Sequence, residues 1–447
     1  MDERILLCLA HMSGNEMRYI NEAFADNWVV PLGPNVNAFE ADLKSFVESR
    51  QGARMLLTDN GLTLWDPAAW AEESPKEIVA LSSGTAAVHL ALIACGVEPG
   101  DEVICQSFTF CASCNPIRYL GATPVLVDSE PDTWNMDPAL LEKAILDRMT
   151  TTGRKPKAII PVYLYGMPAR LDEIMEVAAR YDIPVIEDAA EGMGSRYKGR
   201  MCGTFGKFGV LSFNGNKMIT TSGGGALICQ DAEMKRKIMF YATQARESYP
   251  YYQHEEIGYN YRMSNICAGI GCGQMTVVDG HIAHHRMLAE MYRQAFANVD
   301  GITFHEAPSA DFDSNYWLST ITIDPDLRVK DQERAYAEAV TGAVGGAAGV
   351  TRSARSVHTD CEPNANVEAM RLILDKAGIE SRPLWKPMHL QPVFAGVPAY
   401  TNGVSESLFR QGLCLPSGPH VTPAHARMII DTIVRAIKTE EQDSSKC

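Results

Sequence analysis

The chain has 447 residues, of which 46% are apolar and 21% charged, and its formal net charge at pH 7 is −15. Chains much longer than about 250 residues divide into domains, so more than one domain is expected. The acidic balance argues against a nucleic-acid-binding protein, which normally carries a basic surface. No apolar run reaches the roughly 18 residues that span a bilayer, and the first apolar stretch is too short for a secretory signal. A cytoplasmic location without membrane insertion is therefore expected.

Twelve cysteines in a chain of this size do not indicate a disulfide scaffold. Cys111 and Cys114 have the spacing of a redox or zinc motif. A zinc site would need a second pair at ligand spacing, and none follows in the sequence. No metal is therefore expected, and most cysteines are expected to be small, buried, reduced side chains.

Residues 1–50 are predicted to form an N-terminal helical segment that packs on the large domain. Apolar residues recur at helical spacing, which predicts helices over residues 15–25 and 37–49. Residues 50–78 contain a turn signal, and a short surface helix is predicted near residues 65–70.

Strands and helices alternate from residue 78 onward. Strands are predicted at residues 78–81, 102–105, 124–128, 158–162 and 184–188. Helices are predicted at residues 85–95, 113–120, 138–149 and 171–181. Short β-branched strands separated by helices are typical of a mostly parallel sheet that is covered on both faces. Residues 51–285 are therefore predicted to form a large α/β domain.

The chain after this domain begins with a predicted long helix over residues 265–297. Residues 286–447 are predicted to form a smaller C-terminal α/β domain. Residues 340–350 are rich in glycine and alanine and too apolar for a typical linker, and the sequence assigns them no function.

Lys217 lies in a run rich in Ser, Thr and Gly, residues 212–225, downstream of a strand that ends at Asp188. A pyridoxal phosphate enzyme needs these two groups, an amine for a Schiff base with the cofactor aldehyde and a carboxylate beside the pyridinium nitrogen. Ligands of parallel sheets gather at the carboxyl ends of the strands, where Asp188 is placed. The alternative is an ordinary solvated loop lysine. The pair predicts Lys217 and Asp188 as catalytic residues.

Two further segments suit the phosphate of such a cofactor. Ser82 to Thr85 join a strand to a helix, where free amides and the helix dipole attract an anion, and Gly84 and Thr85 are predicted to bind it. Ser212 adds a hydroxyl, and Asn214, which lies in the same run as Lys217, is also predicted to bind the cofactor. A plain helix N-cap is the alternative for the first segment.

Phe110 and Glu191 are predicted to lie beside the cofactor ring. Phe110 follows a strand and could stack on the pyridine ring, although a core position is the alternative. Glu191 is expected one helical turn beyond Asp188, near the ring oxygen or the substrate. The alternative for Asp188 itself is a helix cap. Lys217, once released, is expected to move a proton between the substrate carbon and the cofactor carbon.

Across nearly its whole length the sequence resembles the sugar aminotransferases of the DegT/DnrJ/EryC1/StrS family. The resemblance is carried by residues 81–87, 187–195, 203–206, 212–217, 258–265 and 381–389. It implies a fold-type I pyridoxal phosphate enzyme that forms a homodimer with both active sites at the interface. It also implies that Asn260 reaches the phosphate of the neighbouring subunit's cofactor, and that Arg262, Lys386 and His389 contact a nucleotide sugar.

The resemblance implies transfer of an amine from L-glutamate to C4 of a 4-keto nucleotide sugar, with pyridoxamine phosphate formed in between. Glu191 and residues 214–225 resemble the UDP-4-amino-sugar enzymes of the N-acetylbacillosamine type, which favours a UDP-linked 4-keto-6-deoxy-N-acetylhexosamine. GDP- and dTDP-linked sugars remain alternatives, the former as in a perosamine-type enzyme. A sugar dehydratase of the family would replace the lysine by histidine, and a non-catalytic regulatory relative would not need Asp188 and Lys217 together.

Overall fold

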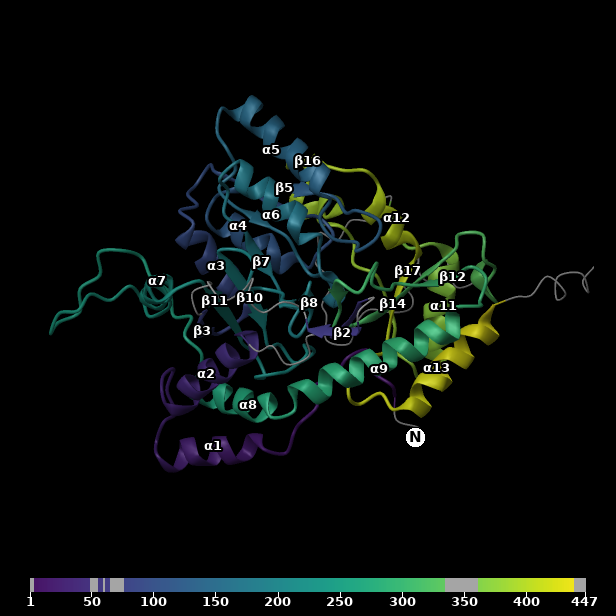
Figure 1. The fold of residues 1–447 in the computed structure, drawn as a ribbon, viewed down its shortest axis with the longest axis horizontal. Helices are drawn as coiled ribbons and strands as arrows, with labels where there is room; N and C mark the ends of the chain where they lie inside the picture. Colours follow the sequence, from purple (N-terminus) through teal and green to yellow (C-terminus); the bar gives the residue numbers. More distant parts are fainter. Residues whose placement is uncertain (1–3, 49–54, 59–60, 65–75, 334–360, 438–447) are drawn as a thin grey trace, which may run out of the picture.

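The structure is a computed structural model, shown in Figure 1. It describes residues 4–48, 55–58, 61–64, 76–333 and 361–437. The short helix predicted at residues 65–70 and the glycine- and alanine-rich residues 340–350 lie outside the described residues. Within the described part, no helix is both long and apolar enough to cross a membrane.

A central sheet is built from two four-stranded halves, in the order β3-β11-β10-β7 and β6-β4-β5-β16. Parallel bridges from Ile159 to Val185 and from Val162 to Asp188 join the halves. The strands are β3 (Glu77–Leu81), β4 (Glu102–Gln106), β5 (Thr123–Val127), β6 (Ile159–Ile160), β7 (Ile186–Asp188), β10 (Phe208–Ser212), β11 (Gly225–Cys229) and β16 (Ala399–Tyr400). All neighbours pair in parallel except β11, which is antiparallel to β3 and β10. The predicted mostly parallel sheet is confirmed.

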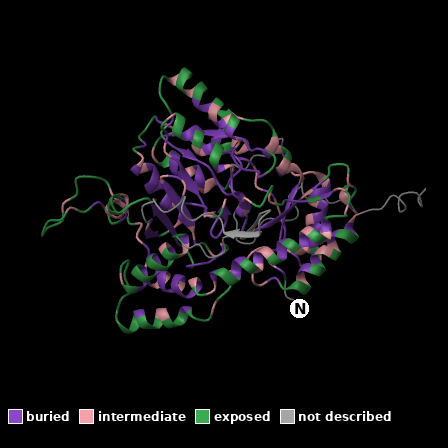
Figure 2. Ribbon diagram, viewed as in Figure 1, coloured by how far each residue is buried: buried purple, intermediate pink, exposed green. Residues whose placement is uncertain are grey.

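The sheet is buried on both faces. Along β4, Ile104 belongs to one apolar cluster with Leu141, whereas its neighbours Val103 and Cys105 belong to another with Leu90. Successive side chains of a strand point to opposite faces, so both faces are covered. Figure 2 shows the buried interior and the exposed outer sides of the helices. The covering helices are α3 (Gly84–Ala94), α4 (Asn115–Tyr119), α5 (Pro138–Thr152), α6 (Leu171–Arg180) and α7 (Ala232–Ala242).

Two predicted helices differ in the structure. The helix predicted at residues 113–120 is a 3₁₀ turn, η2 (Cys111–Ser113), followed by the short α4. The single helix predicted over residues 265–297 is two helices, α8 (Asn265–Met275) and α9 (Val278–Phe296). Between them Val277 leaves the helical region with φ −125°. Consecutive β-branched residues at this point lower helix propensity, which explains the break.

The N-terminal helices α1 (Glu16–Ala25) and α2 (Pro34–Glu48) lie beside α8, as Figure 1 shows at the lower left. Phe39 and Leu43 of α2 are fully buried. A Cβ at Gly271 of α8 would lie only 2.7 Å from the Phe39 ring, so glycine permits this close approach. The N-terminal segment thus packs against the large domain through α8.

The C-terminal part has its own antiparallel sheet, in the order β12-β14-β17-β15, with a separate core that includes Phe296 and Ile321. Its elements are β12 (Ile302–Phe304), β14 (Ser319–Ile323), β15 (Arg382–Pro383), β17 (Gly412–Leu415), α11 (Ala365–Lys376), α12 (Val404–Gln411) and α13 (Pro423–Ala436). The boundary predicted after residue 285 falls inside α9, which runs from the large domain to this one in Figure 1.

Segments after residue 286 also return to the large domain. Strand β16 pairs with β5, and β13 (Phe312–Asp313) pairs with β8 (Arg196–Tyr197). The remaining elements are β1 (Met55–Thr58), β2 (Gly61–Leu64), β9 (Arg200–Met201), η3 (Leu164–Gly166), η4 (Met388–Leu390) and η5 (Pro392–Phe394). The two domains are therefore interleaved along the chain.

Candidate active site

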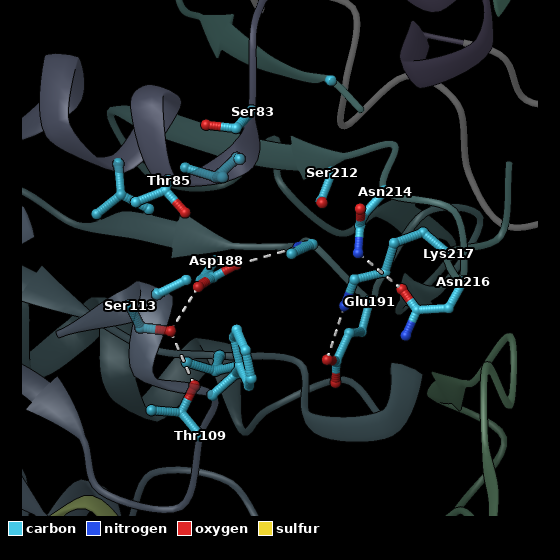
Figure 3. Close-up of a pocket in the computed structure, with 18 of the residues that line it drawn as sticks. Ser83, Thr85, Thr109, Ser113, Asp188, Glu191, Ser212, Asn214, Asn216 and Lys217 are labelled. Carbon is cyan, nitrogen blue, oxygen red and sulfur yellow. Dashed lines mark hydrogen bonds and ion pairs between the residues drawn. The ribbon is translucent and has the colours of Figure 1, made fainter. Parts of the chain in front are cut away.

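A cavity of about 300 Å³ lies where β3, β4, β7 and β10 end (Figure 3). The carboxyl ends of parallel strands meet at one edge of a sheet, which is why residues far apart in the sequence line it together. The predicted residues that line it are Gly84, Thr85, Phe110, Asp188, Glu191, Ser212, Asn214 and Lys217. The structure thus brings eight of the twelve predicted site residues into one space.

The N-terminus of α3 forms one wall of the cavity. Ser83 caps this helix, because its hydroxyl accepts the Ala86 N–H at 3.0 Å. The first amides of a helix, here those of Gly84 and Thr85, have no acceptor within the helix and sit at the positive end of its dipole. A Cβ at Gly84 would lie 3.1 Å from the Ser212 Cβ, so glycine lets the hydroxyl of Ser212 come close to this turn. The wall is suited to a phosphate.

Asp188 ends β7 at the floor of the cavity. Its carboxylate accepts the Ser113 hydroxyl at 2.6 Å and the Ala190 N–H at 3.1 Å, and Ser113 is 2.8 Å from the Thr109 hydroxyl. Burial raises the pKa of Asp188, while these hydrogen bonds and Lys217 oppose the rise. The sequence prediction missed Ser113 and Thr109. Their signal was two hydroxyls four residues apart directly after a buried strand.

Lys217 and Glu191 meet at one side of the cavity (Figure 3). The ammonium of Lys217 lies 3.0 Å from Glu191 Oε1 and 4.1 Å from the centre of the Trp317 ring. Glu191 Oε2 accepts the Tyr165 N–H at 2.8 Å. Burial raises the pKa of Glu191, and Lys217 opposes this rise. The expected helical turn between Asp188 and Glu191 is wrong, because the chain forms a turn there with Gly192 N–H donating to Ala189.

Aromatic side chains form the outer wall. Phe110 is 54% exposed, and its ring centre lies 5.4 Å from that of Trp385. Trp317 also lines the cavity and is almost fully buried. Phe110 is therefore available to a ligand rather than packed in the core. Neither tryptophan was predicted from the sequence, because both come from the C-terminal part of the chain.

The structure places Asn260 and Arg262 outside the residues that line the cavity. Asn260 is exposed and bridges to Thr243 beside α7. Arg262 forms an ion pair with Glu40 of α2, and its guanidinium donates to the Ala80 carbonyl at 2.9 Å. Its side chain is only 8% exposed. The contacts of Arg262 within this chain tie α2 to β3.

Lys386 and His389 follow the cavity residue Trp385 but do not line the cavity themselves. The Lys386 ammonium donates to the Cys361 carbonyl at 2.6 Å. His389 Nδ1 lies 2.7 Å from the Ser107 hydroxyl, and burial lowers the pKa of the imidazole.

The cysteines in the described part have free thiols. In the Cys111–Cys114 pair, whose spacing alone would suit a redox or zinc motif, Cys114 is fully buried and its Sγ lies 3.4 Å from that of Cys105. Within the described ranges no group of three His, Cys, Asp or Glu side chains is placed to hold a metal ion.

The donor set fits pyridoxal phosphate. The N-terminus of α3 and the hydroxyls of Thr85 and Ser212 would face the phosphate, a buried carboxylate lies at the floor, and the Lys217 amine lies in the same cavity beside Glu191. A parallel sheet with these groups at its carboxyl edge defines a fold-type I pyridoxal phosphate enzyme.

Comparison with known proteins identifies the family. The sequence profile of the DegT/DnrJ/EryC1/StrS aminotransferase family matches residues 72–345 and 347–434. EpsN of Bacillus subtilis, named as a pyridoxal phosphate-dependent aminotransferase, is 42% identical over 99% of this chain and 98% of its own. The GDP-perosamine synthase of Caulobacter vibrioides is 32% identical over 97% of both chains.

A solved DegT DnrJ EryC1 StrS aminotransferase from Brucella abortus superimposes with a TM-score of 0.75, at 26% identity over 94% of both chains. The chain belongs to the DegT/DnrJ/EryC1/StrS aminotransferase family. It is a pyridoxal phosphate-dependent sugar aminotransferase that acts on nucleotide sugars.

Proposed function

We propose that the protein transfers an amine from L-glutamate to C4 of a UDP-linked 4-keto-6-deoxy-N-acetylhexosamine, in the biosynthesis of a surface glycan or glycoprotein sugar. Transaminase activity is supported by one observation: Lys217, Asp188 and the N-terminus of α3 line the same cavity. Lysine, carboxylate and anion site are the three groups that pyridoxal phosphate requires.

Each of these residues has a distinct task toward the cofactor. The amides of Gly84 and Thr85, with the Ser212 hydroxyl, would bind the phosphate. Asp188 would hold the pyridinium proton, because a close negative charge favours the charged form. Ser113 orients that carboxylate by its hydrogen bond of 2.6 Å. When bound, pyridoxal phosphate supplies an electron sink for negative charge at the substrate carbon.

Lys217 is the group placed to move the proton. Its amine would bind the cofactor covalently and, once released, carry a proton at Nζ between the substrate carbon and the cofactor carbon. Glu191 lies 3.0 Å away and would hold the amine at this position when it carries the proton. Trp317, Trp385 and Phe110 would keep bulk water from the reacting atoms.

A substrate diphosphate needs cations, and Lys217 is the only arginine or lysine among the described residues that line the cavity. Lys386 and His389 lie on the segment that continues from Trp385, which lines the cavity. The Lys386 ammonium suits phosphate oxygens through charge-assisted hydrogen bonds, and the His389 imidazole can donate a neutral N–H hydrogen bond. We therefore propose that Lys386 and His389 bind the nucleotide sugar.

The uridine nucleotide is favoured by the resemblance of residues 214–225 to the UDP-4-amino-sugar enzymes. The GDP-perosamine synthase of Caulobacter vibrioides, 32% identical over 97% of this chain, favours a second candidate, GDP-4-keto-6-deoxymannose. Comparing kcat/KM for UDP-, GDP- and dTDP-linked 4-keto sugars tests the choice. A preference of about tenfold or more for a GDP or dTDP sugar would overturn UDP and leave the aminotransferase intact.

An absorbance measurement tests turnover before any sugar is chosen. The covalently bound cofactor should absorb visible light, and L-glutamate should bleach this band as 2-oxoglutarate forms. A band that persists with glutamate would favour a non-catalytic cofactor-binding protein.

We also propose a homodimer in which Asn260 serves the neighbouring site. The segment before Asn260 extends away from the body beyond α7 in Figure 1. It carries exposed side chains that a partner would cover, with Tyr251 62%, Tyr252 79% and Ile257 83% exposed. Large exposed apolar side chains gathered on one projection are typical of a protein interface.

A further inference from the structure

The turn directly before Lys217 is an exposed part of the loop that carries it. This loop joins β10 to β11, and the side chains of Asn214 and Asn216 are exposed. Within the loop, the Lys217 N–H donates to the Asn214 carbonyl at 3.0 Å. After the lysine the chain is held by further bonds, such as the one between the Met218 carbonyl and His281. Before the lysine the exposed turn has, within itself, only this bond and the one between the Asn214 and Asn216 side chains, so its position depends on contacts from outside the turn.

Two donors from distant segments meet on the peptide group directly before Lys217. The carbonyl of Asn216 accepts the Trp317 indole N–H at 2.7 Å and the Cys8 thiol at 3.0 Å. Both lone pairs of one carbonyl are thus used by side chains from remote parts of the sequence. This peptide is therefore held from outside the loop.

Cys8 is carried by an N-terminal strand-like segment that is fastened to the C-terminal domain. Ile5 bridges to Ile379, and the Ser417 N–H donates to the Leu7 carbonyl at 2.8 Å. Burial raises the pKa of the Cys8 thiol to about 12, so the thiol keeps its proton and remains a donor.

Trp317, the second donor, is also held in place by hydrogen bonds. It is 2% exposed, and its backbone N–H donates to Asn315 Oδ1 at 2.8 Å. Asn315 Nδ2 in turn donates to the Glu191 carbonyl at 2.7 Å. The Glu191 carboxylate contacts the Lys217 ammonium, which lies over the Trp317 ring. The lysine is thus fixed through its backbone and its side chain by one connected network.

We propose that Cys8 and Trp317 are positioning residues that clamp the Asn216–Lys217 peptide to the C-terminal domain and so set the reach of the Lys217 amine. This inference rests on the proposed role of Lys217 as the cofactor lysine. The contacts of the clamp are between protein atoms, which allows it to be tested without turnover.

Hydrogen–deuterium exchange of the cofactor-free protein tests the clamp. Cys8→Ala removes one donor, and Trp317→Phe removes the other while keeping an aromatic ring under the ammonium. Each should speed exchange of the Lys217 amide about fivefold, the effect of losing one net hydrogen bond. Cys8→Ser keeps a donor and should exchange close to wild type. Cys267→Ala, at a partly buried cysteine of α8, is the matched control.

The loaded enzyme gives a second readout. Cys8→Ala and Trp317→Phe should shift the pH at which the visible cofactor band titrates and lower kcat with little change in KM, and Cys8→Ser should restore both. Unchanged exchange of the Lys217 amide in both variants would overturn the clamp. Borohydride labelling of a lysine other than Lys217 in the wild type would instead overturn the cofactor assignment, and the exchange result would still report on the clamp.

Discussion

The ammonium of Lys217 lies 3.0 Å from the carboxylate of Glu191, and the Glu191 side chain is only 3% exposed. Burial raises the pKa of Glu191, whereas the lysine charge opposes this rise. A buried pair of this kind costs desolvation and is weak evidence for stability, so its place in the cavity indicates a functional use.

Glu191→Gln keeps the shape of the side chain and removes its charge. We expect kcat to fall by roughly 10- to 100-fold, the range for losing a charged hydrogen bond to the proton-carrying amine. The half-reaction with glutamate, followed at the visible cofactor band, measures this. Glu233→Gln, an acidic residue in the first turn of α7, is the control and should retain wild-type rates. Equal rates in the two variants would remove Glu191 from the mechanism.

Lys217→Ala should still bind pyridoxal phosphate but lose turnover, because the phosphate cradle at α3 and the Asp188 carboxylate remain. Borohydride reduction of the wild-type protein, followed by peptide mapping, should place the pyridoxyl group on Lys217. Lys207, the nearest lysine in the sequence, serves as the internal control. A label on Lys207 would contradict the assignment.

Asp188→Asn should separate activity from stability. Without the negative charge the pyridinium nitrogen should lose its proton, and turnover should fall by orders of magnitude. Activity within about threefold of wild type, less than 1 kcal/mol in barrier, would make Asp188 structural only.

The same variant is expected to stabilise the fold of the cofactor-free protein. Burial raises the folded-state pKa of Asp188 above its ordinary value of 3.8, so stability is lost as pH rises from 3.8 through that pKa. Asparagine does not ionise, so the variant does not lose stability in this way as pH rises. Cofactor-free Asp188→Asn should therefore melt above the wild type at pH 7, and the gap should narrow as pH falls toward 3.8. A gap independent of pH would show that the buried charge is not its cause.

The sequence predicted the parts of the site that depend on local pattern. Strands that end at Leu81, Gln106, Asp188 and Ser212 are adjacent or nearly so in one sheet, so polar residues after them had to converge. Ser113 could have been predicted by the same argument.

The contacts of Cys8 and Trp317 with Asn216 could not be predicted in this way. They join residues separated by 208 and 101 positions, and no period or turn signal marks such pairs. The ion pair of Arg262 is another contact between distant positions. The family resemblance implied a substrate contact for Arg262, and the structure pairs it with Glu40, 222 positions away.

Arg262→Met should therefore act on stability. It removes the nearly buried partner of the Glu40 carboxylate and leaves Lys235, 3.6 Å away, as a second cation, so we expect a cost near the lower end of the range for a broken buried pair, about 3 kcal/mol. We expect a clearly lower melting temperature with KM for the nucleotide sugar within about twofold of wild type, a change below 0.5 kcal/mol. The double variant Arg262→Met/Glu40→Gln removes both charges and keeps an acceptor for the Ala80 N–H, so it should recover much of the loss. A raised KM with an unchanged melting temperature would return Arg262 to the substrate site.

The shared site can be tested by mixing two inactive proteins. Asn260→Ala damages the residue proposed to reach the partner's cofactor phosphate, and Lys217→Ala damages the cofactor lysine of its own subunit. In a mixed dimer one site then has both damaged residues and the other has neither. Random exchange of equal amounts makes half of the dimers mixed, so activity should rise to about a quarter of wild type.

Size-exclusion chromatography coupled to light scattering should first show a dimer for each protein. A mixture of Lys217→Ala with Asp188→Asn is the matched control. Each of these changes damages the site of the subunit that carries it, so both sites of every mixed dimer are damaged. This control should stay inactive after exchange, which differently tagged subunits can demonstrate. If the Asn260→Ala mixture also stays inactive despite demonstrated exchange, Asn260 acts within its own subunit or not at all.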